Sequence, residues 1–323
     1  MTMPAEAATA LIVAGPTASG KSALALAIAR RLGGMIINAD SMQVYRELRI
    51  LTARPTPREE ALAPHALYGV RPAAEPSNAG WWRAAALEAM QAARQSGRLP
   101  ILCGGTGLYL TALTEGLAEI PEPDPLARAE ARTLLAELGP RALHERLAVV
   151  DPDTAARLRP TDAQRITRAW EVWRGTGRGL AAWQTEPGTP PAGWRFAAIL
   201  LAPPRAALRA AIAARFEMML AAGALVEVRA LSALGLDPSL PAMRAQGVPE
   251  LAAHLRGELP LAEAVERAVL ATGRYAKRQA TWFRHHRLTA DGRTHTIHAR
   301  ISDLAQFSER NASEIFDFIR FAG

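Results

Sequence analysis

The sequence predicts an α/β protein in which a parallel sheet is flanked by helices and an all-helical domain is inserted into the chain. Over about the first third of the chain, short apolar segments bounded by glycines alternate with stretches of helical periodicity, which is typical of parallel βαβ units. The alternation then stops. A long helical stretch follows three closely spaced prolines, and an apolar strand returns at Phe196.

Apolar periodicity, together with Gly, Pro and N-cap residues, places the individual elements. Buried strands are expected over Ala10–Ala14, Met35–Asn38, Leu99–Cys103 and Phe196–Leu201. Helices are expected over Ser22–Leu32, Asn78–Ser96, Pro125–Leu138, Asp162–Arg174, Arg205–Ala222 and Leu261–His285. Asp124 and Thr161 are the expected N-caps of the third and fourth of these helices.

Prolines and glycines also divide the chain into domains. Pro121, Pro123 and Pro125 mark one linker, and Gly188–Pro191 marks the return linker. The expected catalytic core comprises residues 1–119 and 190–323, and the expected helical insertion comprises residues 120–189.

The composition narrows the class and the location of the protein. Hydrophobic residues make up 49% of the 323 residues and charged residues 21%, which is ordinary for a soluble globular protein. No uninterrupted apolar run reaches the length of about 18 residues that a membrane span needs. The stretch Met1–Ala10 is too short, and with Glu6 too acidic, for a signal peptide. Cys103 is the only cysteine, so a reducing cytoplasm is the expected location.

The chain is basic, with 38 Lys and Arg residues against 31 Asp and Glu residues and a net charge of +7. This excess favours a polyanionic partner, although a GC-rich genome that favours Arg codons explains it equally well. Only Lys21 and Lys277 are lysines. Because arginine and lysine differ in shape and donor geometry, a lysine that persists in such a chain is expected to do what an arginine cannot.

A phosphate-binding loop is expected after the first strand. Residues 15–22 read G-P-T-A-S-G-K-S and match G-x-x-x-x-G-K-[ST] between a strand and a helix. Loop N–H groups and the helix N-terminus supply positive potential, Lys21 adds a compact charge, and the Ser22 hydroxyl can ligate Mg²⁺. The sheet is therefore expected to be P-loop NTPase-like. The expected phosphate-binding residues are Gly15, Pro16, Thr17, Ala18, Ser19, Gly20, Lys21 and Ser22.

Asp40 follows the second predicted strand. Ligands of open parallel sheets bind outside the carboxyl ends of the strands, so Asp40 is expected to face the phosphate site. Three roles are open to its side chain: a metal-binding carboxylate, a general base, or an N-cap of a following helix.

Five sequence blocks carry a family resemblance. They are G-P-T-A-S-G-K-S at 15–22, A-D-S-M-Q-V-Y at 39–45, G-G-T-G-L-Y at 104–109, D-A-Q-R-I-T-R-A at 162–169 and A-K-R-Q-A-T-W at 276–282. Together and in this order they resemble the tRNA dimethylallyltransferases. The resemblance extends over about residues 10–285, which is nearly the whole chain.

The resemblance implies a reaction and its catalytic residues. The phosphate loop holds the diphosphate of dimethylallyl diphosphate, with Mg²⁺, rather than ATP. The dimethylallyl group passes to the N6 amine of the adenosine immediately 3′ of the anticodon in tRNA. That amine must lose a proton as it attacks, and Asp40 is similar in position to the family's proposed base. Lys21 stabilises the departing charge, and Thr17 resembles the family residue that contacts the diphosphate.

The resemblance also implies where tRNA binds. An enzyme that acts on a base must take that base out of the stack, and the helical insertion is expected to supply compensating contacts. The expected tRNA-binding residues are Asp40, Ser41, Met42, Gln43, Thr106, Arg128, Gln164, Arg165, Ile166, Thr167, Arg168, Arg244, Gln246, Gly247, Lys277, Arg278 and Trp282. A solvated basic face is the alternative for the arginines, and a core position is the alternative for Trp282. A monomer without membrane contact is expected.

Three segments depart from the family pattern. Val248 and Pro249 stand where an aromatic and then a basic residue are usual, residues 64–70 depart from the usual P-H-H-L-I-D, and Arg54 stands where lysine is common. None of these departures involves the phosphate loop or Asp40.

Three other functions share part of this pattern. A small-molecule kinase would place ATP in the same loop, an adenylate isopentenyltransferase would prenylate free AMP, and a non-enzymatic RNA-binding protein would use only the basic surface. The kinase leaves the insertion and the block at 276–282 unexplained. His285 and His286 are expected to be solvated or packed rather than metal ligands, because the single cysteine is distant and no carboxylate has matching spacing.

Overall fold

The computed structural model describes residues 8–186, 188–289, 293–301 and 309–322. The chain divides into two compact units, one formed by Met1–Thr114 with Ala192–Gly323 and the other by Glu115–Pro191. Each unit has its own hydrophobic core. The predicted insertion, residues 120–189, lies within the second unit, which begins a few residues earlier.

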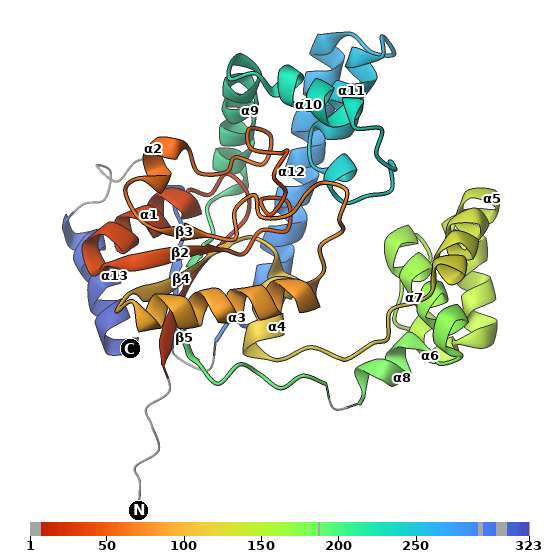
Figure 1. Cartoon of the computed structure of the whole chain (residues 1–323), viewed down its shortest axis with the longest axis horizontal. Helices are drawn as coiled ribbons and strands as arrows, with labels where there is room; N and C mark the ends of the chain where they lie inside the picture. Colours follow the sequence, from red (N-terminus) through yellow and green to blue (C-terminus); the bar gives the residue numbers. More distant parts are fainter. Residues whose placement is uncertain (1–7, 187, 290–292, 302–308, 323) are drawn as a thin grey trace, which may run out of the picture. The chain divides into compact units, whose positions relative to one another are not determined.

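A parallel sheet forms the centre of the larger unit (Figure 1). Over the described residues its strand order is β3-β2-β4-β1-β5-β6, and all neighbouring strands run parallel. The strands are β1 (Thr9–Ala14), β2 (Gly34–Asn38), β3 (His65–Ala66), β4 (Leu99–Gly104), β5 (Arg195–Leu201) and β6 (Thr294–Ile297). The four predicted strands are confirmed. The two edge strands were not predicted because they are short and lack a buried apolar run.

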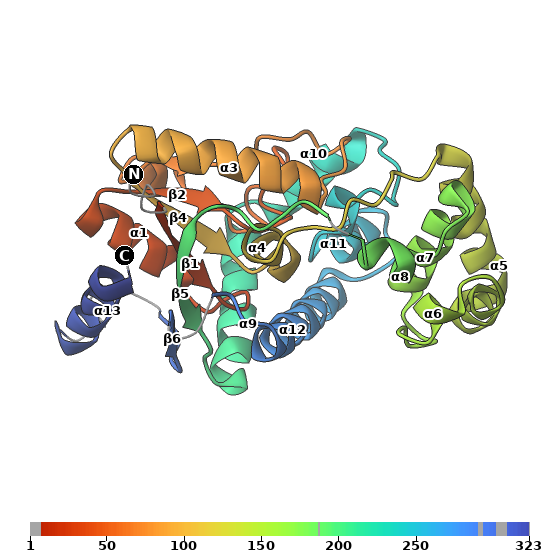
Figure 2. The same ribbon diagram turned by 90° about the horizontal axis from the view of Figure 1, so that it is seen from below.

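Helices cover both faces of the sheet. On one face, α1 (Lys21–Leu32) and α13 (Glu309–Ala322) lie near each other and pack on a core that includes Leu11, Ile101 and Ile199 (Figure 1). The opposite face is covered by α3 (Ala79–Gln95), as seen in Figure 2, with α4 (Gly107–Thr114) packed against α3. Alternate residues of each strand point to opposite faces, so a sheet covered on both sides reads as a continuous apolar run.

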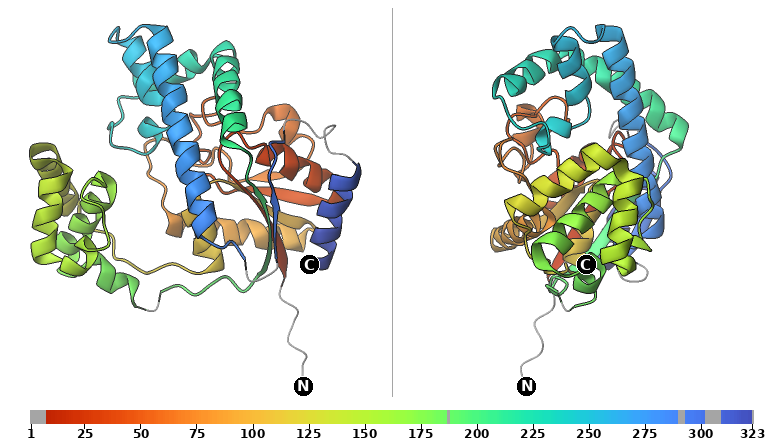
Figure 3. Two further views of the ribbon diagram at one scale, coloured as in Figure 1. Left: turned by 180° about the vertical axis from the view of Figure 1, so that it is seen from behind. Right: turned by 90° about the vertical axis from the view of Figure 1, so that its right-hand side faces the viewer.

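The described part of the larger unit also contains four helices and a 3₁₀ turn between β5 and β6. They are α9 (Arg205–Ala221), α10 (Ala224–Ala233), the 3₁₀ turn η1 (Ala242–Arg244), α11 (Val248–Leu255) and α12 (Leu261–His285). The long helix α12 runs beside α9 (Figure 3), and both pack against Ala18 of the phosphate loop through a small apolar cluster that includes Ile212 and Ala276. A short helix, α2 (Pro57–Glu60), lies in the connection between β2 and β3.

The smaller unit is helical, as predicted. It contains α5 (Pro125–Val150), α6 (Pro152–Ala155), α7 (Ala163–Thr176) and α8 (Leu180–Gln184). Its core is built mainly between α5 and α7, with Leu143, Leu147 and Trp170 buried. The segments that enter and leave it pair with each other through hydrogen bonds between Leu117 and Thr189.

Two predictions about these helices need correction. Thr161 is not the N-cap of α7. The cap is Asp162, whose carboxylate accepts the N–H of Arg165 at 3.2 Å. The helix predicted over Pro125–Leu138 is only the first part of α5. The helix kinks at Gly139 and resumes at Pro140. Proline has no N–H to donate and a fixed φ, so it is well suited to restart a helix at its first position.

Within the described residues no helix combines the length and the apolar character that crossing a bilayer demands.

Candidate active site

The phosphate loop has the predicted context, since it joins strand β1 to helix α1, which begins at Lys21. Gly20 has φ 95°, so the chain enters the helix through a left-handed residue that favours glycine. Lys21 is buried, and its ammonium donates to the Pro16 carbonyl oxygen at 3.5 Å. The side chain of Ser22 is exposed. The helix N-terminus and the ammonium thus form an anion site.

Lys21 lies in surroundings that penalise its charge. Burial lowers the pKa of Lys21, the carboxylate of Asp40 opposes this lowering, and the nearby Arg215 adds to it. Cys103 lies beneath the loop, and burial raises the pKa of its thiol to about 11. The thiol is therefore uncharged near neutral pH, which leaves Asp40 as the anionic neighbour among these groups. A bound anion would offset the free-energy cost of burying the ammonium charge.

Asp40 follows the carboxyl end of β2 in a turn. Its Oδ1 accepts the N–H of Met42 at 2.9 Å, and no helix starts at this point, so the N-cap alternative is wrong. The buried amide of Asn38 holds the backbone of Asp40 on both sides: Asn38 Oδ1 accepts the Asp40 N–H at 2.9 Å, and Asn38 Nδ2 donates to the Asp40 carbonyl at 3.0 Å. The position of the carboxylate is thereby fixed by backbone contacts rather than by a salt bridge.

The G-G-T-G segment after β4 joins the loops around Asp40 and Thr17. Thr106 Oγ1 accepts the N–H of Ser41 at 2.9 Å. Gln279 of α12 accepts the Thr17 N–H at 2.8 Å and donates to the Gly105 carbonyl at 2.9 Å. A Cβ at Gly105 would lie 2.2 Å from Gln279 Nε2, so only glycine permits this approach. The buried amide of Gln279 therefore ties the phosphate loop to the end of β4.

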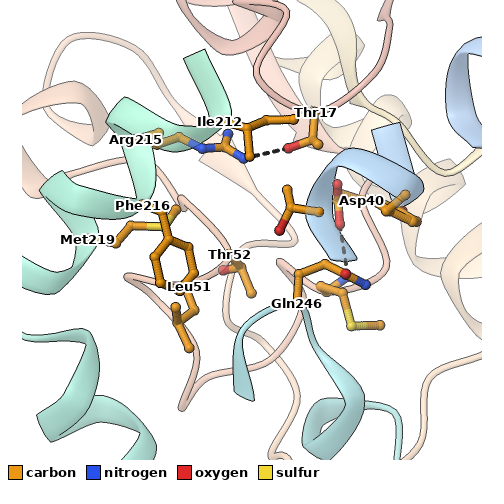
Figure 4. Close-up of a pocket in the computed structure, with 12 residues that line it drawn as sticks. Thr17, Asp40, Leu51, Thr52, Ile212, Arg215, Phe216, Met219 and Gln246 are labelled. Atoms are coloured by element: carbon orange, nitrogen blue, oxygen red, sulfur yellow. Dashed lines mark hydrogen bonds between the residues drawn. The ribbon is translucent and has the colours of Figure 1, made fainter. Parts of the chain in front are cut away.

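A pocket opens beside these loops (Figure 4). It is lined by Thr17, Asp40, Met42, Leu51, Thr52, Ile212, Arg215, Phe216, Met219, Gln246, Thr272 and Tyr275. The structure thus brings together Thr17, Asp40, Met42 and Gln246 from the predicted set, which come from segments far apart in the sequence.

One end of the pocket is polar and cationic. Arg215 of α9 donates to Thr17 Oγ1 at 2.7 Å (Figure 4). Burial lowers the pKa of Arg215, and Asp40 opposes this effect. Burial has the opposite effect on the phenol of Tyr275, which also lines the pocket: it raises the pKa of this group, so the phenol stays protonated near neutral pH.

One wall of the pocket is apolar. Leu51, Ile212, Phe216 and Met219 line it, and each has less than a tenth of its surface exposed. A Cβ at Gly247 would lie 3.0 Å from the Phe216 ring, so this predicted residue shapes the wall by its lack of a side chain. The pocket lining therefore combines cationic and apolar parts, which suits a molecule that carries both an anionic and an apolar group.

Several site residues escaped the sequence analysis. Among them are the lining residues Leu51, Thr52, Ile212, Phe216, Met219, Thr272 and Tyr275. Two others are instructive. Arg215 is a charged residue within the apolar stripe Ile212, Phe216 and Met219 of one helix, and such an interruption is a usable signal. Gln279 lies inside the block at 276–282, but its amide is indistinguishable from a surface glutamine until the tertiary contacts are known.

The remaining predicted residues of the larger unit lie outside the pocket lining. The Gln43 amide donates to the carbonyls of Thr52 and Ala53 at 2.8 and 3.0 Å, which shapes the pocket loop. Lys277, Arg278 and Arg244 are exposed. Trp282 is half-buried, packs over Gly107 and stacks on His286 with 4.3 Å between ring centroids. Its ring therefore contributes to packing and also keeps an accessible surface.

In the smaller unit the predicted residues differ in exposure. Gln164 and Arg165 are exposed, and Arg168 is partly exposed. Arg165 pairs with Asp162 and Arg168 with Glu171, both at 3.5 Å, while Arg128 pairs with Glu122. Thr167 Oγ1 donates back to the Ala163 carbonyl at 2.7 Å. Ile166 is fully buried in the core of the unit, so its side chain offers no surface to a ligand.

The residues present fit a magnesium ion of the kind that phosphates bring with them. Over the described residues no cluster of three or more His, Cys, Asp or Glu side chains could hold a metal by itself. Mg²⁺ is usually bound by one or two protein oxygens together with substrate phosphates and water. The hydroxyl of Ser22 and the carboxylate of Asp40 are oxygen ligands of that kind at and near the loop.

A phosphate loop after the central strand β1, with a carboxylate after β2, which β4 separates from β1 in the same parallel sheet, defines a P-loop-like α/β protein. The family model described as IPP transferase matches residues 43–286, and the one described as isopentenyl transferase matches residues 8–63. A tRNA dimethylallyltransferase of Granulibacter bethesdensis is 63% identical over 96% of this chain and 98% of its own, and one of Gluconobacter oxydans is 61% identical over 96% and 94%.

Solved structures agree. The tRNA isopentenylpyrophosphate transferase of Bacillus halodurans has 30% identity and a TM-score of 0.68, covering 98% of this chain and 97% of its own. A eukaryotic dimethylallyltransferase acting on tRNA has 25% identity and a TM-score of 0.77, covering 97% and 80%. The chain belongs to the IPP transferase family, and the resemblance seen in its sequence blocks is confirmed.

Proposed function

We propose that this chain transfers a dimethylallyl group from dimethylallyl diphosphate to the N6 amine of the adenosine immediately 3′ of the anticodon in tRNA and releases diphosphate. The observation that carries the proposal is a pocket that combines an anion-binding loop with an apolar wall. Thr17 of that loop, Arg215 and Asp40 line the pocket, and the wall of Leu51, Ile212, Phe216 and Met219 is apolar.

The proposed reaction balances as a substitution. The bond between the allylic carbon and the diphosphate oxygen breaks, and its electron pair leaves with the oxygen. The lone pair of N6 forms the new carbon–nitrogen bond, and the N6 proton passes to the Asp40 carboxylate. Lys21, the loop N–H groups and Arg215 stabilise the charge that accumulates on the departing diphosphate. When bound, Mg²⁺ neutralises part of that charge, and Ser22 with the diphosphate would hold it.

The apolar wall suits the dimethylallyl group and leaves water little room beside it. Exclusion of water strengthens the electrostatic contacts at the reacting carbon. We also propose that the protein is a monomer and acts in the cytoplasm, where tRNA is found.

Mass analysis of tRNA tests the proposal. tRNA is incubated with the protein, Mg²⁺ and dimethylallyl diphosphate, and its nucleosides are then separated. One prenyl group on an anticodon-loop adenosine is the expected product. Parallel reactions with free AMP as acceptor, and with ATP in place of the prenyl donor, should give no product. Transfer to AMP alone, or cleavage of ATP alone, would assign the site to one of the other two enzymes.

Arg215→Ala is expected to lower kcat about 10²–10³-fold, the usual effect of removing one preorganised donor from a site of developing charge. Arg215→Lys should retain part of the activity because the charge is kept while the two-pronged donor is lost. Steady-state rates with saturating tRNA measure both effects. Arg209→Ala is the control, because Arg209 lies exposed on the same helix. Equal rates in Arg215→Ala and Arg209→Ala would remove Arg215 from the mechanism.

Arg165→Ala and Arg168→Ala are each expected to reduce the slope of log affinity against log salt by about one unit, as expected for the loss of a phosphate contact. The pair of Arg165 with Asp162 is exposed and that of Arg168 with Glu171 is partly exposed, and both are long at 3.5 Å, so phosphates can replace them. Binding of tRNA over a salt series measures the slope, with the exposed Arg146→Ala as control. Slopes unchanged from wild type would assign both arginines to a solvated face.

A further inference from the structure

The phosphate loop has an outer side, and a segment from the far end of the chain is bound to it. Arg300 Nε donates to the Ala18 carbonyl oxygen at 3.1 Å, across 282 residues of sequence. The next residue, Ile301, donates its backbone N–H to the Ser19 carbonyl oxygen at 3.0 Å. We refer to residues 298–301, which follow strand β6, as the C-terminal strap.

These two hydrogen bonds fix the orientation of two peptide units in the phosphate loop. In a peptide unit the N–H and the C=O point in opposite directions, so a loop that aims N–H groups at an anion must turn its carbonyls outward. The strap supplies donors to two consecutive outward carbonyls, those of Ala18 and Ser19. Of the two N–H groups on the same peptides, that of Ser19 donates to the Pro16 carbonyl oxygen at 3.3 Å and so closes the turn of the loop, and that of Gly20 lies where helix α1 begins.

The loop conformation needs such support. Ala18 has φ 65°, a left-handed conformation that residues with a Cβ rarely adopt. Strained residues of this kind persist where surrounding contacts over-determine them. The close approach of the strap is also visible at Gly20, where a Cβ would lie 1.9 Å from the Ile301 carbonyl oxygen. The second glycine of the phosphate motif therefore leaves room for the strap.

The strap is itself firmly placed. Strand β6 pairs with β5 up to the partners Ile297 and Leu201. Ile301 is buried in the same core cluster as Leu201 and Ile315 of α13. The donors of the strap are thus held by the sheet at one end and by the core at the other.

Arg300 also adds charge to the anion site. Burial is the main cause of the lowered pKa of Arg215, and the positive charge of Arg300 contributes to the lowering. The two guanidinium groups are therefore close enough to repel each other, and a bound anion would offset that repulsion.

We propose that Arg300 is a positioning residue for the diphosphate of the prenyl donor, acting through its bond to the Ala18 carbonyl, which holds the peptide that closes the turn of the phosphate loop and so keeps the loop in its anion-binding conformation. This inference rests on the proposed function, because it assigns diphosphate to that loop. In this proposal Arg300 acts on the loop and not on the reacting carbon.

Titration with magnesium pyrophosphate tests the inference on the full chain. Arg300→Ala should bind pyrophosphate about ten-fold more weakly, the effect of losing one hydrogen bond to a charged donor. The KM for dimethylallyl diphosphate should rise by a similar factor, while the KM for tRNA and the unfolding temperature stay unchanged. Arg300→Lys, which keeps a cationic donor, should recover most of the loss, whereas Arg300→Met should not. His298→Ala is the control, since His298 is exposed on the same strap.

The outcomes separate the two proposals. Wild-type protein that fails to bind pyrophosphate would overturn the proposed function. Wild-type binding that is unchanged in Arg300→Ala would overturn only the role of the strap. An equal loss in Arg300→Lys and Arg300→Ala, or an unfolding temperature that falls in step with affinity, would also overturn the positioning role.

Discussion

Asp40→Asn is expected to lower the rate of prenyl transfer by about 10²–10⁴-fold, the usual contribution of a positioned general base. Asparagine keeps an oxygen that can accept the Met42 N–H, so the turn after β2 is preserved while the base is lost. Affinity for tRNA should stay within a few-fold of wild type. Single-turnover rates with saturating tRNA, and tRNA binding measured separately, give the two quantities.

The chain offers a matched control for this substitution. Asp237 accepts the N–H of Ser239 at 2.7 Å in a turn of the same kind, on an exposed segment away from the pocket lining. Asp237→Asn should leave the rate unchanged. If Asp40→Asn turns over tRNA as fast as Asp237→Asn, another group must accept the N6 proton.

Lys21→Met is expected to lower kcat about 10²–10³-fold and to weaken pyrophosphate binding, because the charge nearest to the loop is lost. Lys21→Arg should recover little activity, since a planar guanidinium does not fit the space of a compact ammonium. Titration with magnesium pyrophosphate and steady-state rates measure the two effects. Lys277→Met, which changes the other lysine, should keep the pyrophosphate affinity because Lys277 is exposed on α12. Unimpaired pyrophosphate binding by Lys21→Met would exclude the loop as the diphosphate site.

The same substitution makes a prediction about stability. The pKa of Lys21 is lowered in the folded protein, chiefly by burial, so the unfolded chain holds this proton more tightly than the folded chain. The charged lysine therefore costs stability near neutral pH, and the free energy of unfolding rises as pH increases through the interval between the lowered pKa and 10.5. Lys21→Met should unfold at an equal or higher temperature than wild type at pH 7, and should lose the rise at high pH. A clear loss of stability would show that the ammonium is better satisfied than its burial implies.

Some features of this protein follow from local sequence alone. A buried strand, a glycine-rich turn and a helix starting at Lys21 follow one another directly in the chain. The phosphate loop consists of residues that are adjacent in sequence, so it can be predicted without tertiary information. Asp40 was placed by a similar local argument, because it directly follows a strand whose carboxyl end must face the site. The helical insertion could also be predicted from the prolines that flank it and from the loss of the strand–helix alternation.

The tertiary structure alone decided which distant side chains complete the site. Arg215, Gln279 and Arg300 reach the loop from 198, 262 and 282 residues away. Periodicity reports the buried face of a helix, but it does not report which polar residue on that face finds a partner, since this depends on how α9, α12 and β6 pack against the sheet. The local sequence therefore determined that a phosphate loop forms. The packing of distant helices and strands decided which side chains hold that loop in place and which ones complete the site.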